Sequence, residues 1–227
     1  LTLDSIVPPE QPLDEPSAVF YGACLVLALE HIHMENCVFR GIDPSAILLD
    51  EDGHLQLVDF RFTKAVEGRT FTLCGNPEYM APETVEQTGH TAAADWWALG
   101  CLIFWMIEGR TPFADEGDDD IKIYRSITNR AEIKFDKCSG VARDLIEALL
   151  DPEPNARIGF NSGRDDIRNH EFFLDIDWEA ISTAMLDSVP VTPGIRERIS
   201  SVAQPDIEQL VGIRDVRPGV NAWFDSY

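Results

Sequence analysis

The longest apolar stretches of the chain have helical spacing. Between residues 16 and 33 the apolar positions recur every three to five residues, at Phe20, Cys24, Leu27 and Ile32, which predicts a long core helix. Between residues 92 and 107 nearly every position is apolar, which predicts a helix buried on most of its sides. We expect further helices at 119–127, 140–150 and 165–170.

The remaining segments have β-type, loop-like or weak patterns. Two short β-type runs, 47–49 and 55–58, flank the turn sequence Asp50-Glu51-Asp52-Gly53 and predict a hairpin. Residues 63–83 contain Gly and Pro without periodicity, which predicts a long functional loop. The Pro-rich and acid-rich residues 1–16 predict a loop or edge segment, and the pattern after Trp178 predicts a tail.

Composition narrows the class of protein. The chain has 227 residues, of which 44% are hydrophobic and 26% charged, and this favours one soluble globular domain without membrane insertion. A net charge of -22 disfavours nucleic acid and anionic membranes as partners. Five widely spaced cysteines without a Cys-x-x-Cys pair predict reduced, mostly buried thiols in an intracellular, cytoplasmic protein. Because the chain begins at Leu1 without a secretory signal, we expect it to be a piece of a longer polypeptide.

Four motifs in order carry a family resemblance. They are Phe39-Arg-Gly-Ile-Asp-Pro-Ser-Ala46, Asp59-Phe-Arg61, Ala81-Pro-Glu83 and Asp95-Trp-Trp-Ala-Leu-Gly100, with Thr72-Leu-Cys-Gly-Asn-Pro-Glu-Tyr79 preceding the third. This order resembles the C-lobe of protein kinases of the AGC, cyclic-nucleotide-dependent type, over residues 14–178. The resemblance implies a mainly α fold, the large kinase lobe with a short β hairpin, and a small lobe that would precede Leu1.

A narrower resemblance concerns the sequences Phe39-Arg-Gly-Ile-Asp-Pro44 and Gly53-His-Leu-Gln-Leu-Val-Asp-Phe-Arg-Phe62. They look like the kinase-like domain of plant and algal proteins that join a metal-dependent protein phosphatase, cyclic-nucleotide-binding domains and a kinase-like domain. This implies a parent protein with cyclic-nucleotide sensors and a phosphatase upstream. The AGC resemblance implies a leading segment 1–16, a kinase-like C-lobe 17–178 and an AGC-like tail 179–227. The tail ends Trp223-Phe224-Asp225-Ser226-Tyr227, which resembles the segment that packs on the nucleotide cleft in AGC kinases, and an exposed tail is the alternative.

The catalytic positions depart from the kinase pattern H-R-D-L-x-x-x-N, in which the Asp accepts a proton and the Asn binds magnesium. Here Gly41 stands for the Asp, Ala46 for the Asn, and Asp43 for the AGC lysine that neutralises the γ-phosphate. Asp59 keeps the metal-binding position of D-F-G, but Arg61 replaces its Gly. We expect Arg61 to pair with Asp59 or Asp43 and to replace the metal.

Other positions match the family in different roles. Leu48 and Asp59 match vestigial nucleotide-binding positions, and Thr72 matches the activation-loop phosphosite with Arg40 and Lys64 as its cations. An unmodified Thr72 with its cations in solvent is the alternative. Of the acids that select basic peptides, only Glu78 is present, since Ser45 and Trp105 occupy the other positions. Structural roles are implied for Phe39, Phe60, Glu83, Asp95 and Arg157, with Glu83 and Arg157 forming a buried ion pair.

The leading hypothesis is therefore a catalytically inactive pseudokinase module. It would regulate or scaffold another domain of its parent chain or a protein partner, within a cyclic-nucleotide-linked signalling protein, and would need no cofactor. Two alternatives stay open: a residual serine/threonine kinase that uses ATP and magnesium, and a structural subunit of a large assembly.

Overall fold

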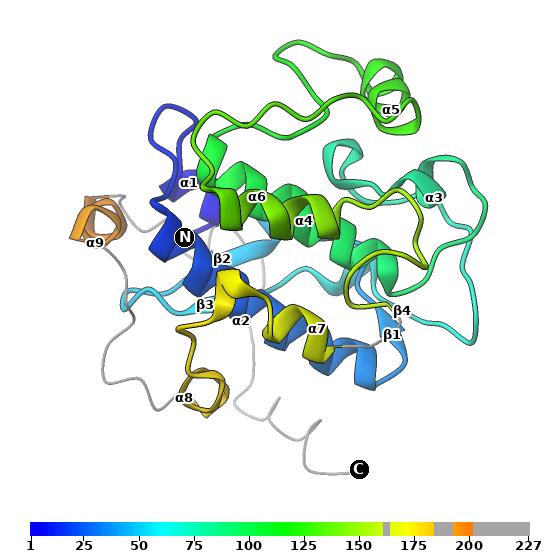
Figure 1. Ribbon diagram of the computed structural model, residues 1–227. Coiled ribbons are helices and arrows are strands. Elements are labelled where there is room, and N and C mark those ends of the chain that lie inside the picture. Colours follow the sequence, from blue (N-terminus) through cyan, green and yellow to red (C-terminus); the bar gives the residue numbers. More distant parts are fainter. Residues whose placement is uncertain (161–163, 184–192, 202–227) are drawn as a thin grey trace, which may run out of the picture.

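The computed structural model describes residues 1–160, 164–183 and 193–201, and the fold is mostly helical (Figure 1). The α-helices are α1 Leu3–Ile6, α2 Glu15–Met34, α3 Pro82–Val85, α4 Ala93–Glu108, α5 Asp120–Thr128, α6 Gly140–Leu149, α7 Arg164–Arg168, α8 Trp178–Ser182 and α9 Pro193–Ser201. The strands are β1 Cys37–Val38, β2 Ile47–Leu49, β3 Leu55–Leu57 and β4 Lys64–Ala65. Short 3-10 turns lie at Pro44–Ala46, Phe60–Phe62, Pro77–Tyr79 and Glu171–Phe173.

Helix α4 is the centre of the core. Every one of its residues except Ala94 is buried, as its almost entirely apolar sequence predicts, and α2 and α6 pack against it. Gly100 permits the close approach of α6, because a Cβ added there would lie 2.9 Å from Leu149 Cβ. Helix α4 ends at Glu108, and the following Gly109 has a φ of 80°, in the left-handed region that glycine favours. The helices predicted from periodicity are therefore confirmed, with ends shifted by a few residues at most.

Helix α2 supplies the second layer of the core. Asp14 caps its first turn by accepting a hydrogen bond from Ser17 N at 3.2 Å. Within the described residues, α2 is the one helix whose length and composition would allow it to cross a membrane. The sequence pattern had predicted no apolar segment long enough to do so. The buried apolar residues of α2, among them Tyr21, Leu25 and Leu29, belong to the hydrophobic core, which favours a core helix over a membrane span.

The predicted hairpin is confirmed. Strands β2 and β3 pair antiparallel with Ile47 opposite Leu57 and Leu49 opposite Leu55, and the turn between them uses Gly53 at a φ of 90°. A second two-stranded sheet joins β1 to β4, so that Cys37 lies opposite Ala65. The sequence pattern missed this sheet, because strands of two residues have no measurable alternation.

The two ends of the described chain contain helices that the sequence pattern missed. Residues 1–16 are not only loop, since α1 buries Leu3 and Ile6 in the core. Helices α8 and α9 lie in the region predicted to be a tail, and Figure 1 shows α9 beside α1. Arg198 on α9 donates a hydrogen bond to the carbonyl of Gln11 at 2.8 Å. The predicted ending 223–227 lies outside the described residues, and the domain limits stay predictions.

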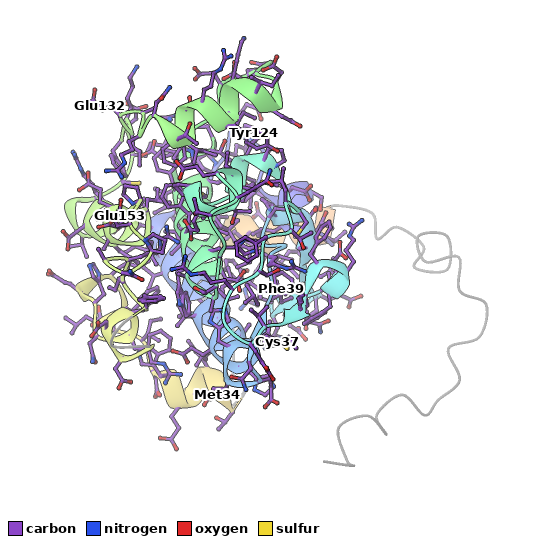
Figure 2. The ribbon with its side chains drawn as sticks, turned by 90° about the vertical axis from the view of Figure 1, so that its right-hand side faces the viewer. Met34, Cys37, Phe39, Tyr124, Glu132 and Glu153 are labelled. Carbon is purple, nitrogen blue, oxygen red and sulfur yellow. The ribbon has the colours of Figure 1, made fainter. Side chains whose placement is uncertain are left out.

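The C-terminal end of α2 and the region of α5 lie at opposite ends of the molecule. Figure 2 shows Met34 at one end and Tyr124 with Glu132 at the other, with Phe39 between them.

All five cysteines are free, as predicted, but only Cys101 is fully buried and the other four are half-buried. The prediction of mostly buried thiols was therefore wrong.

Candidate active site

Asp95 holds the backbone of residues 39–46, the segment that resembles the catalytic loop of kinases and is called the catalytic loop below. Its carboxylate accepts hydrogen bonds from Phe39 N and Arg40 N, both at 2.8 Å, and His33 Nε2 lies 2.8 Å from Oδ2. The Asp95 side chain is 1% exposed, so these bonds lie in a low-dielectric interior where they are strong. They stabilise a bend in which Arg40 has a φ of 62°. The loop conformation is thus fixed by an α4 residue.

The three altered positions of this loop, Gly41, Asp43 and Ala46, lack the side-chain groups that phosphoryl transfer uses there. Asp43 caps the 3-10 turn Pro44–Ala46, because its Oδ1 accepts from Ser45 N at 2.8 Å and from Ser45 Oγ at 2.5 Å. Ala46 is buried and supplies no side-chain ligand atom. At Gly41 an added Cβ would lie 3.3 Å from Phe62 Cδ2 and 3.7 Å from Phe39 Cε1, so a larger side chain would need a small adjustment of Phe62.

Asp59 pairs with Arg61, one of the two predicted partners. Arg61 Nε lies 2.8 Å from Asp59 Oδ1 and 2.7 Å from Oδ2, and Arg61 Nη2 also donates to Oδ2. These hydrogen bonds lower the pKa of the Asp59 carboxyl and raise the pKa of Arg61. Asp59 has a φ of 66°, a left-handed conformation that Asp adopts more readily than most residues. The pair places a guanidinium directly on the carboxylate that stands at the metal-binding position of D-F-G, as expected for an arginine that replaces the metal.

The residues present do not fit a magnesium site of the kinase type. Such a site needs carboxylate or amide oxygens free to approach the ion, and kinases use the D-F-G Asp with the catalytic-loop Asn. Here both oxygens of Asp59 accept from Arg61, and Ala46 stands at the Asn position. Leu48, the other vestigial nucleotide position, is the half-buried middle residue of β2 and bridges to Thr2.

Phe39 and Phe60 touch as expected. Their rings pack edge to face with centroids 5.4 Å apart and an interplanar angle of 86°. Phe39 is fully buried, but Phe60 is 54% exposed, so the predicted position of Phe60 inside the lobe was wrong. The aromatic stack is open to solvent on the Phe60 side.

The structure does not join Thr72 to its two expected cations by hydrogen bonds. Thr72 is exposed. Arg40 Nε donates to the carbonyl of Phe62 at 2.7 Å, and Lys64 Nζ donates to Thr70 Oγ1 at 3.2 Å. A phosphate on Thr72 would therefore compete with these existing contacts.

The buried ion pair of Glu83 and Arg157 is present. Arg157 Nη1 and Nη2 lie 2.8 Å and 3.1 Å from the two Glu83 oxygens, and the side chains are 0% and 5% exposed for Arg157 and Glu83. The guanidinium also donates to the carbonyls of Ala93 at 2.7 Å and Asp151 at 3.0 Å and lies over the Trp97 ring. This pair connects α3, α4 and the segment after α6.

The peptide-selecting acid is engaged within the fold. Glu78 Oε2 accepts a hydrogen bond from Thr111 Oγ1 at 2.8 Å. Trp105, at a position where an acid is expected, is buried, and Ser45 is bonded to Asp43. Of these three positions, only Glu78 therefore offers a carboxylate.

Sequence reasoning missed two histidines of this region. His33 bonds to Asp95 across 62 residues, and periodicity within one helix contains no signal for such a distant partner. His90 is 2% exposed and lies in a backbone bridge to Thr70, with hydrogen bonds of 2.9 Å and 2.8 Å in the two directions. His90 follows Gly89 in a segment without periodic apolar positions, so the sequence around it does not distinguish a buried histidine from an exposed one.

Comparison with known proteins decides the family. Residues 2–173 match the model described as "Protein kinase domain". The chain belongs to the protein kinase domain family. It is 44% identical over 199 residues to the "cAMP-dependent protein kinase catalytic subunit" of Dictyostelium discoideum, which covers 86% of this chain and 30% of that protein.

Other kinase relatives agree. The "cAMP-dependent protein kinase catalytic subunit PRKX" of Homo sapiens is 41% identical over 79% of this chain and 49% of its own length. The "cAMP-dependent protein kinase type 3" of Saccharomyces cerevisiae is 36% identical over 95% of this chain and 55% of its own length. This kinase domain is therefore closely homologous to cAMP-dependent kinase catalytic subunits, and it spans about half or less of their length.

Proposed function

We propose that this kinase domain does not transfer phosphate and acts instead by binding, as a regulatory or scaffolding module of a larger cyclic-nucleotide-linked signalling protein. The observation that carries the proposal is the ion pair in which Arg61 occupies both oxygens of Asp59. The proposed partners are other domains of the parent chain, such as the phosphatase and cyclic-nucleotide-binding domains of the plant and algal proteins, or a separate protein.

The electrostatics of phosphoryl transfer support this proposal. Transfer needs cations around the γ-phosphate and a metal that bridges the phosphates. At the corresponding positions the chain offers Asp43 in place of a lysine and Ala46 in place of a metal ligand. Gly41 removes the proton acceptor, and that loss alone lowers a rate by roughly 10²- to 10⁴-fold. The three losses affect different parts of the reaction.

Retention of the architecture supports a binding role. Asp95 holds the loop backbone, and Glu83 with Arg157 connects three segments of the lobe. Neither arrangement needs a substrate or a nucleotide. A lobe that keeps its shape without its reactive groups still presents a surface of fixed geometry.

A residual serine/threonine kinase that uses ATP and magnesium is the second candidate. It is favoured by one observation, namely that the relatives at 36% to 44% identity are named as cAMP-dependent protein kinases. This candidate requires a small lobe with an intact glycine-rich loop and lysine, together with departure of Arg61 from Asp59.

The test is a phosphorylation assay on the full-length protein with radiolabelled ATP, in magnesium and in manganese. We expect no incorporation by the wild-type protein or by Gly41→Asp, since restoring the proton acceptor leaves the metal and phosphate positions unchanged. The control is Asp59→Ala. Stoichiometric incorporation by the wild-type protein that disappears in Asp59→Ala would overturn the proposal and establish the residual kinase.

A further inference from the structure

An open apolar groove lies where the C-terminal end of α2 meets the start of α4. Its volume is about 400 Å³, and its wall includes His33, Met34, Ala92, Trp96 and Phe160. No residue of the catalytic loop lines it. The groove is therefore a feature of the lobe that is separate from the altered catalytic positions.

Two large apolar side chains are exposed in this groove. Met34 is 56% exposed and Phe160 is 39% exposed, and the ring of the buried Trp96 lies between α2 and the segment that carries Phe160. Single exposed apolar residues are common on protein surfaces, but several that line one concavity are typical of a binding site. Covering them with an apolar side chain of a partner would remove their surface from water, which is favourable.

The groove also offers a hydrogen-bond donor. Trp96 Nε1 donates no hydrogen bond within residues 1–160, 164–183 and 193–201. Gly159 leaves the space beside this nitrogen open, because a Cβ added there would lie 3.0 Å from Trp96 Nε1. A buried indole usually finds an acceptor for its N–H group. The backbone carbonyl of a peptide lying in the groove would supply one.

Three exposed carboxylates surround the groove. Glu35 follows α2 directly, and Asp165 and Asp166 lie in the first turn of α7, which packs beside α2 in Figure 1. Within the described part of the chain none of these three, which we call the rim carboxylates, forms an ion pair. The nearby Arg168 is already paired with Glu30. Together with the net charge of -22, the rim carboxylates favour a cationic partner.

We propose that this groove binds a short segment of a partner protein in which a bulky apolar side chain lies next to a lysine or an arginine. The apolar side chain packs against Met34, Trp96 and Phe160, and the cation faces the rim carboxylates. His33 in the groove wall bonds to Asp95, so the partner lies beside the residue that holds the catalytic loop.

This inference names the kind of partner for the proposed binding role and rests on that role. The groove residues are not those that the phosphorylation assay tests. Failure of the groove to bind would therefore leave the result of that assay unchanged, and the two proposals can fail separately.

The first test selects binding segments from a library. Short peptides of random sequence are displayed on phage and selected on the wild-type protein, and enriched peptides are synthesised with a fluorescent label for anisotropy measurements. We expect enriched sequences to combine Phe, Trp, Leu or Met with Lys or Arg. No enrichment, or enrichment of acidic peptides, would overturn the proposal.

Removal of the exposed apolar side chains should prevent this binding. In the double variant Met34→Ser with Phe160→Ser, the affinity for the enriched peptides should fall at least about tenfold, because a few buried apolar anchors supply most of the binding energy of such contacts. The matched control is Leu174→Ser, since Leu174 is 76% exposed and does not line the groove. Equal affinities of the double variant and the control would contradict the proposal.

Neutralising the rim carboxylates should weaken binding and its dependence on salt. In the triple variant Glu35→Gln, Asp165→Asn and Asp166→Asn, we expect the affinity at low salt to fall roughly two- to tenfold, the range that a few exposed ion pairs supply. The affinity that remains should respond less to added sodium chloride than that of the wild type.

The control for the rim variant changes the net charge equally at other places. Glu10→Gln, Glu116→Gln and Glu132→Gln replace three exposed carboxylates, and Figure 2 shows Glu132 at the end of the molecule opposite to Met34. This control should bind the peptides as the wild type does. A loss equal to that of the rim variant would indicate general charge attraction and would overturn the proposal.

The last test locates the peptide in the groove. The NMR resonance of the Trp96 indole N–H, assigned with Trp96→Phe, should shift when the protein is saturated with an enriched peptide, whereas that of Trp105 near the other end of α4 should not. An unshifted Trp96 resonance would overturn the proposal. So would sedimentation of the protein alone as a dimer that the double variant converts to a monomer, because the occupant would then be a second copy of this chain.

Discussion

Arg61 and Asp59, two residues apart, form a side-chain ion pair in which Arg61 Nε lies 2.8 Å from Asp59 Oδ1 and 2.7 Å from Oδ2. In a kinase of the usual pattern the residue at the Arg61 position is Gly, which has no side chain to reach the carboxylate. One substitution therefore provides a permanent cation at the metal position. The pair is partly exposed, with Asp59 at 30% and Arg61 at 68%, so its contribution to stability is small.

Replacement of Arg61 should change the titration of Asp59. In Arg61→Gly the pKa of Asp59 should rise from its lowered value toward the ordinary value of about 3.9, because the donor that stabilises the carboxylate is gone. The lowered pKa makes the pair a stabilising contact above the unfolded pKa, and this contribution is lost as the pH falls through the folded pKa. Carbon-13 NMR of the labelled carboxyl measures the shift.

The control for this titration is Arg61→Lys, which keeps a cation and should keep the pKa lowered. Added manganese should broaden the NMR resonances of residues near Asp59 more in Arg61→Gly than in Arg61→Lys. An unchanged Asp59 pKa in Arg61→Gly would show that the ion pair does not form in solution.

Glu83→Gln should destabilise the fold strongly. It leaves the Arg157 guanidinium buried with an uncompensated charge, and loss of one partner of such a pair costs roughly 3–5 kcal/mol. Urea unfolding measures the loss. The matched control is Glu153→Gln, which breaks the exposed pair with Arg130 and should cost less than about 1 kcal/mol. Equal effects of the two variants would refute the structural role of Glu83.

Two glycines with similar backbones should respond differently to alanine. Gly75 has a φ of 104° and Gly68 a φ of 93°, so either substitution costs roughly 1–2 kcal/mol of backbone strain. At Gly75 the new Cβ would also lie 2.7 Å from the Arg40 carbonyl oxygen, whereas at Gly68 nothing lies within 4 Å. Urea unfolding should therefore show a larger loss for Gly75→Ala. A loss no larger than that of Gly68→Ala would contradict the close contact of Gly75 with Arg40.

Thr72 is exposed and therefore accessible to a modifying enzyme. We expect a phosphate there to draw Lys64 away from Thr70 Oγ1 and to order the loop through charge-assisted hydrogen bonds. Mass spectrometry of protein from its native source locates the modification, and hydrogen exchange across residues 63–80 measures the ordering. Persistently unmodified Thr72 would reject this prediction.

Long periodic elements were predictable from the sequence, and short or distant contacts were not. The α4 helix has 16 residues and an apolar pattern that requires burial, so its existence follows from local information. The four-residue α1 has too few residues to be stable alone, and its burial of Leu3 and Ile6 in the core stabilises it. Helix α9 likewise buries Ile195 and Ile199 in the core, whereas α8 contacts the core through the partly buried Trp178 and Ile181.

In the candidate site too, contacts between near neighbours in the sequence were predictable and contacts between distant segments were not. Pairing of Asp59 with Arg61 was foreseeable because the residues are two positions apart and opposite in charge. The contact of His33 with Asp95 and the unpaired nitrogens of Arg40 and His90 depend on how α2, α4 and the loops pack together. The exposure of Phe60 likewise depends on which surfaces the fold covers, and a motif does not contain this information.

Asp95 contacts the catalytic loop through backbone N–H groups, which every residue other than proline possesses. The contacts between Asp95 and the loop therefore do not depend on the side chains at 41 and 46, whereas the Asp43 side chain still caps the turn Pro44–Ala46. Substitutions at 41 and 46 leave both of these backbone hydrogen bonds in place. In evolutionary terms, the residues that preserve the shape of this lobe differ from those at the positions that phosphoryl transfer uses, so the shape can be inherited while the residues at 41 and 46 change.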